Sequence, residues 1–323
     1  MRILSGIQPS GRPHLGNYFG ALRQYVTLQE GNEPFYFIAS YHALTAVQDG
    51  KLLRDYTVGV ALDFLAIGLD PAKAALFAQQ DVPEVTELMW ILSCVTPMGL
   101  LERAVSYKDK VAQGLSPNHG LFAYPVLQAA DILIYLSDLV PVGQDQKQHL
   151  EMTRDIAAKF NQQFGEVFTI PEPYILDSTA VIPGVDGRKM SKSYGNEIGI
   201  FEEGGALKKK VMSIVTDSAP VEAPKDPSES TPYLLLKLLA TPGESAEWEA
   251  RYRAGGMGYG DVKKRLLELI NDYFAPFREK RRELEKDPGY VNDVLRDGGA
   301  RARAVAQEVM HKVREATGLP TTY

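Results

Sequence analysis

The sequence predicts an α/β fold in which a parallel-sheet domain is followed by a smaller, all-helical C-terminal domain. Two observations support this prediction. Short apolar runs alternate with amphipathic helical patterns up to about residue 203, and strand patterns are absent after that point. Because strand–helix alternation places parallel strands in one sheet with helices on both faces, the first region is expected to be a layered α/β unit.

Four apolar runs are predicted to be buried strands: Arg2–Ser5, Phe35–Ala39, Ala75–Gln79 and Leu139–Val142. Between them, Val85, Leu88 and Leu92 recur at helical spacing. Asp81 and Glu84 stand three apart just before this stripe, a spacing typical of a capping box. The apolar stretch Val126–Leu136 predicts a further helix.

After residue 203 the patterns are helical. Helices are expected over residues 206–215 and 233–239, along a long stripe that starts near Asp261, and along a last stripe from Ala302 to Val313. Pro276 should kink or divide the long stripe. We therefore expect a sheet domain over residues 1–203 and a helical domain over residues 204–309.

Composition limits the classes of protein that fit. The 323 residues include 35 basic and 41 acidic side chains, so the net charge of −6 gives no overall attraction to nucleic acid, although a local basic face could still bind RNA. The single cysteine, Cys94, lies in an apolar run and is expected in the core. No Cys/His cluster has metal-ligand spacing, so neither zinc nor an iron–sulfur cluster is expected. No signal peptide or membrane helix is evident, which favours a cytoplasmic protein.

The first chemical motif follows the first predicted strand directly. The run Gln8-Pro-Ser-Gly-Arg-Pro-His14-Leu-Gly16-Asn17 opens a predicted helix, whose unpaired N–H groups suit a phosphate. Glycine permits close backbone approach, and His14 and Asn17 add side-chain donors. An ordinary Gly/Pro turn is the alternative interpretation, because the run matches neither the P-loop nor the dinucleotide fingerprint.

The second motif is Lys189-Met190-Ser191-Lys192-Ser193, which follows a glycine-flanked segment. Two ammonium groups on such a loop could close over a polyphosphate and follow its charge to the leaving group. A solvated surface loop is the alternative.

Together, His14–Asn17 and Lys189–Ser193 resemble the two signatures of class I aminoacyl-tRNA synthetases. Asn17 stands where the usual signature has a second histidine, a variant common in the tryptophanyl branch. Longer runs make the chain resemble the tryptophanyl-tRNA synthetases over nearly its whole length: Ser5–Gly11, Gly16–Arg23, Tyr107–Lys110, Tyr124–Ile132, Val140–His149 and Val215–Ser218.

This resemblance implies a Rossmann-like catalytic domain, a helical domain that reads the anticodon of tRNA(Trp), and a final helix (about residues 310–323) that returns to the catalytic domain. It also implies a homodimer, and ATP bound with Mg²⁺ as the substrate complex. The residues that it assigns to ATP are Gln8, Pro9, Ser10, Gly16, Asn17, Gly143, Gln144, Asp145, Val181 and the five residues Lys189 to Ser193. His14, Asn17, Lys110, Lys189 and Lys192 would stabilise the reacting phosphates.

Asp131 is the strongest candidate for recognition of L-tryptophan. It lies in an apolar helical stretch, where a solvated charge is not expected. The indole N–H only donates hydrogen bonds, so a pocket that selects it needs a fixed acceptor, and a carboxylate is the strongest. An aspartate paired with arginine is the alternative. Tyr124 and Gln128 share this stretch, His42 would border the pocket or simply be packed, and Gln146 would face the substrate's ammonium or carboxylate.

Because of Gln128, tyrosine remains an alternative to tryptophan as the substrate. With Tyr124 and Asp131, Gln128 forms a pattern similar to that of archaeal tyrosyl-tRNA synthetases, and a phenol hydroxyl both donates and accepts. Two other classes of protein remain as alternative functions: a non-catalytic RNA-binding protein derived from a synthetase, and a small-molecule adenylyltransferase. The basic run Arg278–Arg282 could contact tRNA phosphates or form a solvated helix face.

Overall fold

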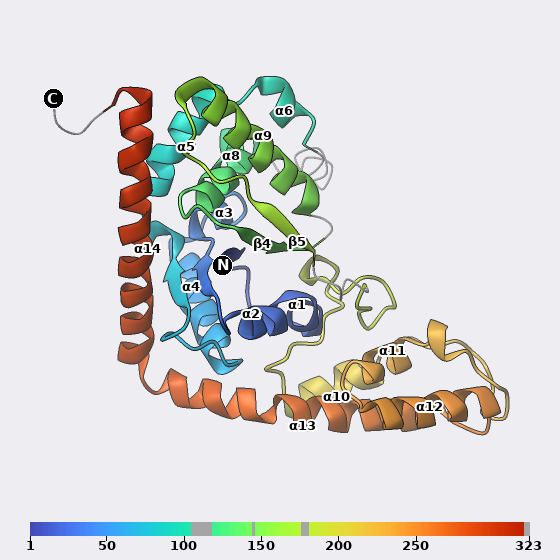
Figure 1. The fold of residues 1–323 in the computed structure, drawn as a ribbon. Coiled ribbons are helices and arrows are strands. Elements are labelled where there is room, and N and C mark those ends of the chain that lie inside the picture. The colour runs from blue at the N-terminus through green and yellow to red at the C-terminus, as the bar shows by residue number, and fades with distance from the viewer. Residues whose placement is uncertain (105–117, 144–145, 176–180, 320–323) are drawn as a thin grey trace. The chain divides into compact units, whose positions relative to one another are not determined.

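The computed structural model describes residues 1–104, 118–143, 146–175 and 181–319. The chain divides into two compact units (Figure 1). The first contains residues 1–11, 25–177 and 284–323, and the second contains residues 12–24 and 178–283. The boundary expected at residue 203 therefore differs from the observed grouping, in which the Lys189–Ser193 motif belongs with the helical region.

A five-stranded parallel sheet forms the centre of the first unit. Its strands are β1 (Arg2–Ile7), β2 (Glu33–Ile38), β3 (Ala75–Ala78), β4 (Leu139–Val142) and β5 (Glu172–Ile175). The order is β3-β2-β1-β4-β5, and every pairing is parallel. This is the strand order of the dinucleotide-binding α/β folds, so the predicted Rossmann-like fold is confirmed. The sequence did not predict β5, a short edge strand that contains Pro173.

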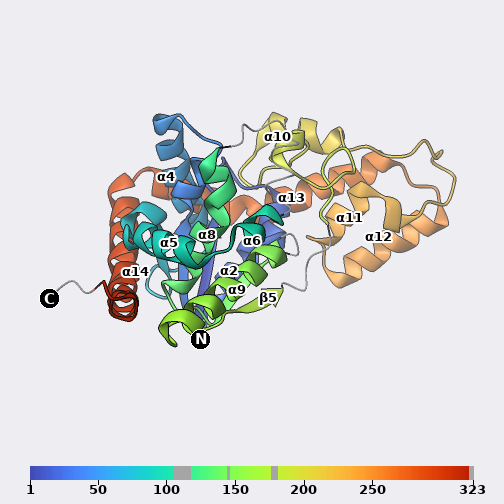
Figure 2. The ribbon, with the colours of Figure 1, turned by 90° about the horizontal axis from the view of Figure 1, so that it is seen from above.

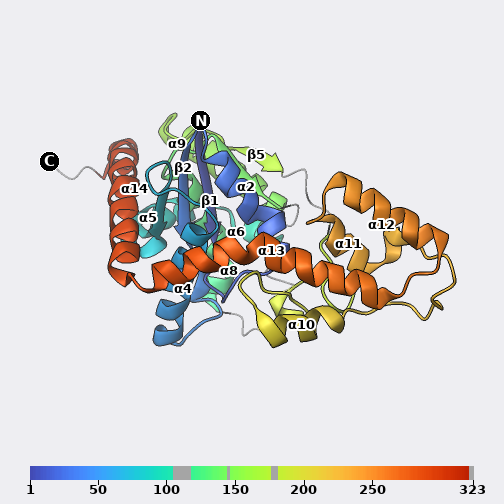
Figure 3. The ribbon, with the colours of Figure 1, turned by 90° about the horizontal axis from the view of Figure 1, so that it is seen from below.

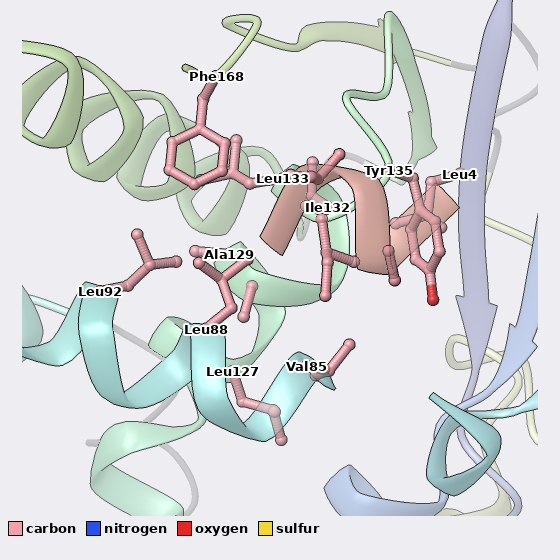
Figure 4. Packing of buried hydrophobic residues seen from close by; sticks show 14 of the residues in the cluster. Leu4, Val85, Leu88, Leu92, Leu127, Ala129, Ile132, Leu133, Tyr135 and Phe168 are labelled. Atoms are coloured by element: carbon pink, nitrogen blue, oxygen red, sulfur yellow. The ribbon is translucent and has the colours of Figure 1, made fainter. Parts of the chain in front are cut away.

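Helices cover the sheet of the first unit: α3 (Ser40–Ala43), α4 (Gly50–Ala66), α5 (Glu84–Val95), α6 (Met98–Glu102), α8 (His119–Leu133) and α9 (Lys147–Phe164). Figure 2 shows α5, α8 and α9 packed together. In their core, Leu88 of α5 lies beside Ala129 of α8, and Tyr135 lies beside Leu4 of β1 (Figure 4). This apolar core fixes α8, which carries Asp131.

The last helix, α14 (Pro288–Thr317), packs along the edge strand β3 (Figure 1). Two glycines allow the close approach. A Cβ atom on Gly298 would lie 2.0 Å from the carbonyl oxygen of Leu76, and one on Gly299 would lie 2.8 Å from the Asp81 Cβ. The edge strand is thereby covered by a helix.

The second unit is mainly helical. It holds α1 (Leu15–Asn17), a π-helical segment Tyr18–Leu22, α10 (Gly204–Met212), α11 (Thr231–Lys237), α12 (Pro242–Ala254) and most of α13 (Tyr259–Glu285); α2 (Arg23–Leu28) leads back to the first unit. Figure 3 shows α10, α11 and α12 along α13. The rings of Tyr18 and Phe19 pack against Tyr273 and Phe274, and the Tyr18 and Tyr273 hydroxyls lie 3.0 Å apart.

Two local predictions were wrong. Cys94 is exposed on α5. The capping box does not form, because Asp81 accepts from the Ala78 N–H while Glu84 binds Arg303 of α14 at 2.8 Å. Of the two outcomes expected at Pro276, the division of the helix is excluded, because α13 continues through this residue. None of the described helices is both long and apolar enough to cross a bilayer.

Candidate active site

The Asp131 carboxylate is buried in the first unit, and the residue as a whole is only 2% exposed. His42 of α3 places its ring Nε2 2.7 Å from Oδ2 of Asp131. The alternative of an arginine partner is wrong for the described part of the chain, where the His42 ring takes that place. Burial raises the pKa of Asp131, and the hydrogen bonds from His42 and then Gln79 oppose that rise.

Gln79 is a second contact of Asp131 that sequence reasoning missed. Its side-chain nitrogen lies 2.8 Å from Oδ1 and 2.9 Å from Oδ2 of the carboxylate. Gln79 begins the short 3₁₀ helix Gln79–Asp81 directly after β3. The only feature of the sequence that pointed to Gln79 was its position at the carboxyl end of a predicted parallel strand, because ligands of such sheets bind beyond these ends.

The other residues predicted to bind tryptophan lie on α8 and just before α9. Tyr124 is buried on α8, its ring packs edge-on to His42 at 6.2 Å, and its hydroxyl bonds Nε2 of His149 at 2.8 Å. Gln128 is half-buried on the same helix, one turn from Tyr124. Gln146 is half-buried beside Gly143, whose carbonyl accepts its backbone N–H at 2.9 Å.

Strand order places the predicted nucleotide residues of the first unit at its switch point. β1 lies between β2 and β4, so the connections run in opposite directions on its two sides. Open α/β sheets bind ligands at this point, beyond the carboxyl ends of the strands. Gln8, Pro9 and Ser10 follow β1, and Gly143 follows β4. The Gln8 amide donates to the His42 carbonyl at 3.5 Å.

In the second unit, His14 is a buried ring held in one tautomer. Nδ1 accepts from the backbone N–H of Asn17 at 3.3 Å, and the Asn17 side-chain oxygen accepts from the His14 N–H at 3.2 Å. Burial first, and then the charge of Lys192, lower the pKa of His14 to about 4. The ring is therefore neutral at pH 7, with its proton on Nε2.

The two sequence motifs meet within the second unit. The Lys192 charge acts on His14, and a Cβ on Gly16 would come within 3.5 Å of the Met190 Cβ. The segment around His14 is also anchored, since the Leu15 N–H donates to the Ile198 carbonyl at 2.9 Å. Lys189 and Ser193 are exposed, while Met190 is buried. Ser191 and Ser193 share a hydroxyl contact of 2.8 Å.

Asn196 holds the Lys189–Ser193 loop in place and was also missed. Its side-chain oxygen accepts from the Ser191 N–H at 2.8 Å, while its nitrogen donates to the Lys189 carbonyl at 3.1 Å and to Asp186 at 2.7 Å. Asn196 is buried, and Gly184 leaves it room, because a Cβ there would lie 2.4 Å from the amide.

Lys110, Gln144 and Asp145 fall outside the described residues. Val181 is exposed in the second unit. In the basic run, Arg278 is buried against the Ile200 carbonyl at 3.0 Å and Arg281 lies buried over the Phe201 ring. The prediction that these two arginines form a solvated face or contact tRNA phosphates was therefore wrong.

The fold and these two motifs are those of a class I aminoacyl-tRNA synthetase. The family described as tRNA synthetases class I (W and Y) matches residues 1–275, and the chain belongs to this family. Among its relatives, the protein named tryptophan–tRNA ligase from Rhodopirellula baltica is 55% identical over 319 residues, which cover 99% of this chain and all of that protein.

Solved structures agree with this assignment. The tryptophanyl-tRNA synthetase of Campylobacter jejuni, solved with ADP and tryptophan, is 52% identical with a TM-score of 0.93, and the match covers 99% of this chain and 100% of that one. The tryptophanyl-tRNA synthetase of Mycoplasma pneumoniae is 31% identical with a TM-score of 0.84, over 99% and 98% of the two chains.

Proposed function

We propose that this chain is a tryptophan–tRNA ligase, which activates L-tryptophan with ATP and transfers it to tRNA(Trp). The observation that carries this conclusion is the full-length identity of 55% to a tryptophan–tRNA ligase. The geometry supports it independently, because the buried Asp131 carboxylate is the acceptor that an indole N–H needs.

For the amino acid, we assign recognition of the indole to Asp131. His42 and Gln79 hydrogen-bond its carboxylate. Tyr124 and Gln128 lie on α8, the helix that carries Asp131. The substrate's ammonium or carboxylate is assigned to Gln146. A site built around one hydrogen bond rejects analogues without the matching group by about 10⁴–10⁵, so it has no need of a separate editing reaction.

For ATP, the phosphate-directed groups are His14, Asn17, Lys189 and Lys192. Because Nδ1 of His14 already accepts a hydrogen bond, Nε2–H is its donor. Lys110 is proposed as a further phosphate-directed lysine. The remaining proposed ATP contacts are Gln8, Pro9, Ser10, Gly16, Gly143, Gln144, Asp145, Val181, Met190, Ser191 and Ser193.

The reaction needs no covalent nucleophile on the enzyme. A carboxylate oxygen of tryptophan attacks the α-phosphorus of ATP, forming tryptophanyl-adenylate while pyrophosphate leaves. A ribose hydroxyl at the 3′ end of the tRNA then attacks the adenylate carbonyl, and AMP leaves. Catalysis depends on positioning and on cationic donors that stabilise the leaving pyrophosphate. Mg²⁺ enters with ATP, held mainly by its phosphates and water.

The proposed partners are tRNA(Trp) and a second copy of the chain, in the cytoplasm where the tRNA is used. The helical residues 204–309 are the proposed anticodon reader. The surface assigned to the second copy lies on α5 and α6, where Trp90 is 72% exposed, Met98 is 61% exposed, and Cys94 is exposed one turn from Trp90. Neighbouring exposed apolar side chains of this size are typical of protein interfaces.

Charging of tRNA tests the whole proposal. The purified chain should attach labelled tryptophan to tRNA(Trp) in the presence of ATP and Mg²⁺. Attachment of tyrosine instead would make Gln128 and Asp131 a phenol pocket. Adenylate formation without transfer to tRNA would favour an adenylyltransferase, and tRNA binding without either reaction would favour a non-catalytic RNA-binding protein.

A further inference from the structure

The Gln79 side chain is fixed in orientation by backbone donors. It is 1% exposed, and its oxygen accepts from the backbone N–H of Tyr41 at 2.9 Å and from that of His42 at 3.4 Å. A backbone N–H can only donate, so the amide oxygen must face α3. The amide nitrogen consequently faces the opposite way.

That nitrogen meets both oxygens of Asp131, at 2.8 and 2.9 Å. A flipped amide would place its oxygen against the carboxylate and its N–H groups against two backbone donors. Both contacts would then be repulsive, so only one orientation satisfies Gln79. The amide thus links the first turn of α3 to the carboxylate on α8.

The donors are unequally divided between the two carboxylate oxygens. Oδ2 receives the His42 Nε2 and the Gln79 nitrogen, whereas Oδ1 receives Gln79 alone among the described residues. Each carboxylate oxygen can accept about two hydrogen bonds. Within the described part of the chain, one acceptor position on Oδ1 is therefore unfilled, and Gln79 sets the direction in which it points.

We propose that Gln79 is a positioning residue for amino-acid selection, which orients the Asp131 carboxylate so that the open position on Oδ1 meets the indole N–H. This inference rests on the proposed function. Gln79 acts through Asp131 rather than by touching the substrate, and its donors also favour the ionised carboxylate, which accepts hydrogen bonds on both oxygens.

The buried surroundings of Asp131 make the hydrogen bonds from Gln79 important for keeping its carboxylate ionised. Burial raises the pKa of the carboxyl group, which would otherwise tend toward the protonated form. The other titratable groups nearby are His42 on α3, Tyr135 just after α8, and His149 on α9, which is reached through Tyr124. Burial, followed by the Asp131 charge, raises the pKa of Tyr135, so that phenol stays neutral and offers no compensating charge.

Two variants separate positioning from packing. Gln79→Glu retains an oxygen for the Tyr41 and His42 N–H groups but places a second carboxylate against Asp131. Gln79→Met has a similar length and removes both polar interactions. The readout is kcat/KM in ATP–pyrophosphate exchange for tryptophan, relative to an analogue in which sulfur replaces the indole N–H. Only tryptophan depends on the Oδ1 acceptor, so both variants should lower this ratio by about 10- to 100-fold.

Gln29 provides a matched control. It is a buried glutamine of the same unit, with its oxygen 2.9 Å from the Asp70 N–H and its nitrogen 3.2 Å from the Gly68 carbonyl. Gln29→Met should lower stability while leaving the substrate ratio unchanged. In an Asp131→Asn background, Gln79→Met should cause no further fall in the ratio, because the group through which it acts is already altered.

The outcomes are distinct. If wild-type protein is active and folded Gln79→Glu keeps the wild-type ratio, then Gln79 only packs α3 and this inference is overturned alone. A further fall in the ratio when Gln79→Met is added to Asp131→Asn would also overturn it. A wild-type chain without tryptophan-dependent exchange would instead overturn the proposed function, and this inference with it.

Discussion

His14 and Asn17 bind each other reciprocally: the ring Nδ1 accepts from the Asn17 backbone N–H at 3.3 Å, and the Asn17 side chain accepts from the His14 backbone N–H at 3.2 Å. Asn17 stands where the usual class I signature has a second histidine, and here its oxygen caps the helix start. The arrangement leaves Nε2–H as the ring donor of His14, the group that we propose for a phosphate of ATP.

The lowered pKa of His14 predicts its behaviour on titration. Its ring signals should shift with a midpoint near pH 4, far below the ordinary value of 6.5. Between pH 6.5 and 4 the unfolded chain binds a proton that the folded chain does not, so the free energy of unfolding should fall as the pH falls through this window. An NMR titration measures the midpoint. Chemical denaturation of the wild-type chain and of His14→Gln, compared across this pH range, measures the change in the free energy of unfolding. A midpoint near 6.5 would contradict the buried, neutral ring.

Asp131 should control the use of tryptophan without controlling the use of ATP. Asp131→Asn keeps the shape but replaces a charged acceptor with an amide, so kcat/KM for tryptophan should fall by about 10- to 100-fold. The affinity for ATP, measured by titration without amino acid, should stay at the wild-type value. Unchanged kinetics with tryptophan would remove the basis for assigning Asp131 to the indole.

Asn196 should support the Lys189–Ser193 loop. Asn196→Ala removes an acceptor from the Ser191 N–H and a donor from the Lys189 carbonyl, so the loop should lose its fixed position and KM for ATP should rise by about tenfold. Asn161→Ala is the control, because Asn161 makes similar backbone bonds to Val167 and Phe168 in the other unit. If both variants change KM for ATP equally, Asn196 has no special role in the loop.

Gly298 should be essential for packing α14. A Cβ there would lie 2.0 Å from the Leu76 carbonyl oxygen, so Gly298→Ala forces the helix away from β3 and should cost about 2 kcal/mol or more. Gly59 lies inside α4 with no atom within 4 Å of an added Cβ, so Gly59→Ala should stabilise by about 0.5–1 kcal/mol. Chemical denaturation measures both changes. Equal effects would show that α14 does not dock as described.

Trp90 should hold the proposed dimer together. Trp90→Glu places a charge among the exposed side chains of α5 and should convert a dimer into monomers, as measured by light scattering after size exclusion. Val221→Glu changes an exposed apolar residue of the second unit and should leave the mass unchanged. A Trp90→Glu protein that remains dimeric would place the interface elsewhere.

The sequence predicted the strands and the buried carboxylate because their signals are local. Each of the first four strands contains a run of mainly apolar residues, and Asp131 is a charge inside an apolar helix. The fifth strand was missed, since Glu172 and Pro173 make up half of its four residues and leave only Tyr174 and Ile175 as an apolar pair. From the sequence alone, the Gly298–Gly299 pair indicates only a low local helix propensity. In the structure, the pair permits close contact of α14 with β3 and the residues that follow it.

The supporting residues were missed because their partners are distant or ordinary. Gln79 and Asp131 are 52 positions apart, and no periodicity connects a single glutamine after a strand with a carboxylate on a helix. Asn196 follows the Lys189–Ser193 motif closely, but only the folded loop shows that its amide binds Lys189 and Ser191. Arg278 and Arg281 read as part of a charged surface, yet they are buried against a carbonyl and a ring.

Amino-acid-dependent ATP–pyrophosphate exchange measures directly whether this chain activates tryptophan. Each amino acid is offered separately to the folded chain with ATP, Mg²⁺ and labelled pyrophosphate. We expect exchange with tryptophan and at least about 10⁴-fold lower kcat/KM with phenylalanine, which lacks the N–H donor. Exchange that favours tyrosine over tryptophan, or that fails with every amino acid although ATP binds, would contradict this expectation.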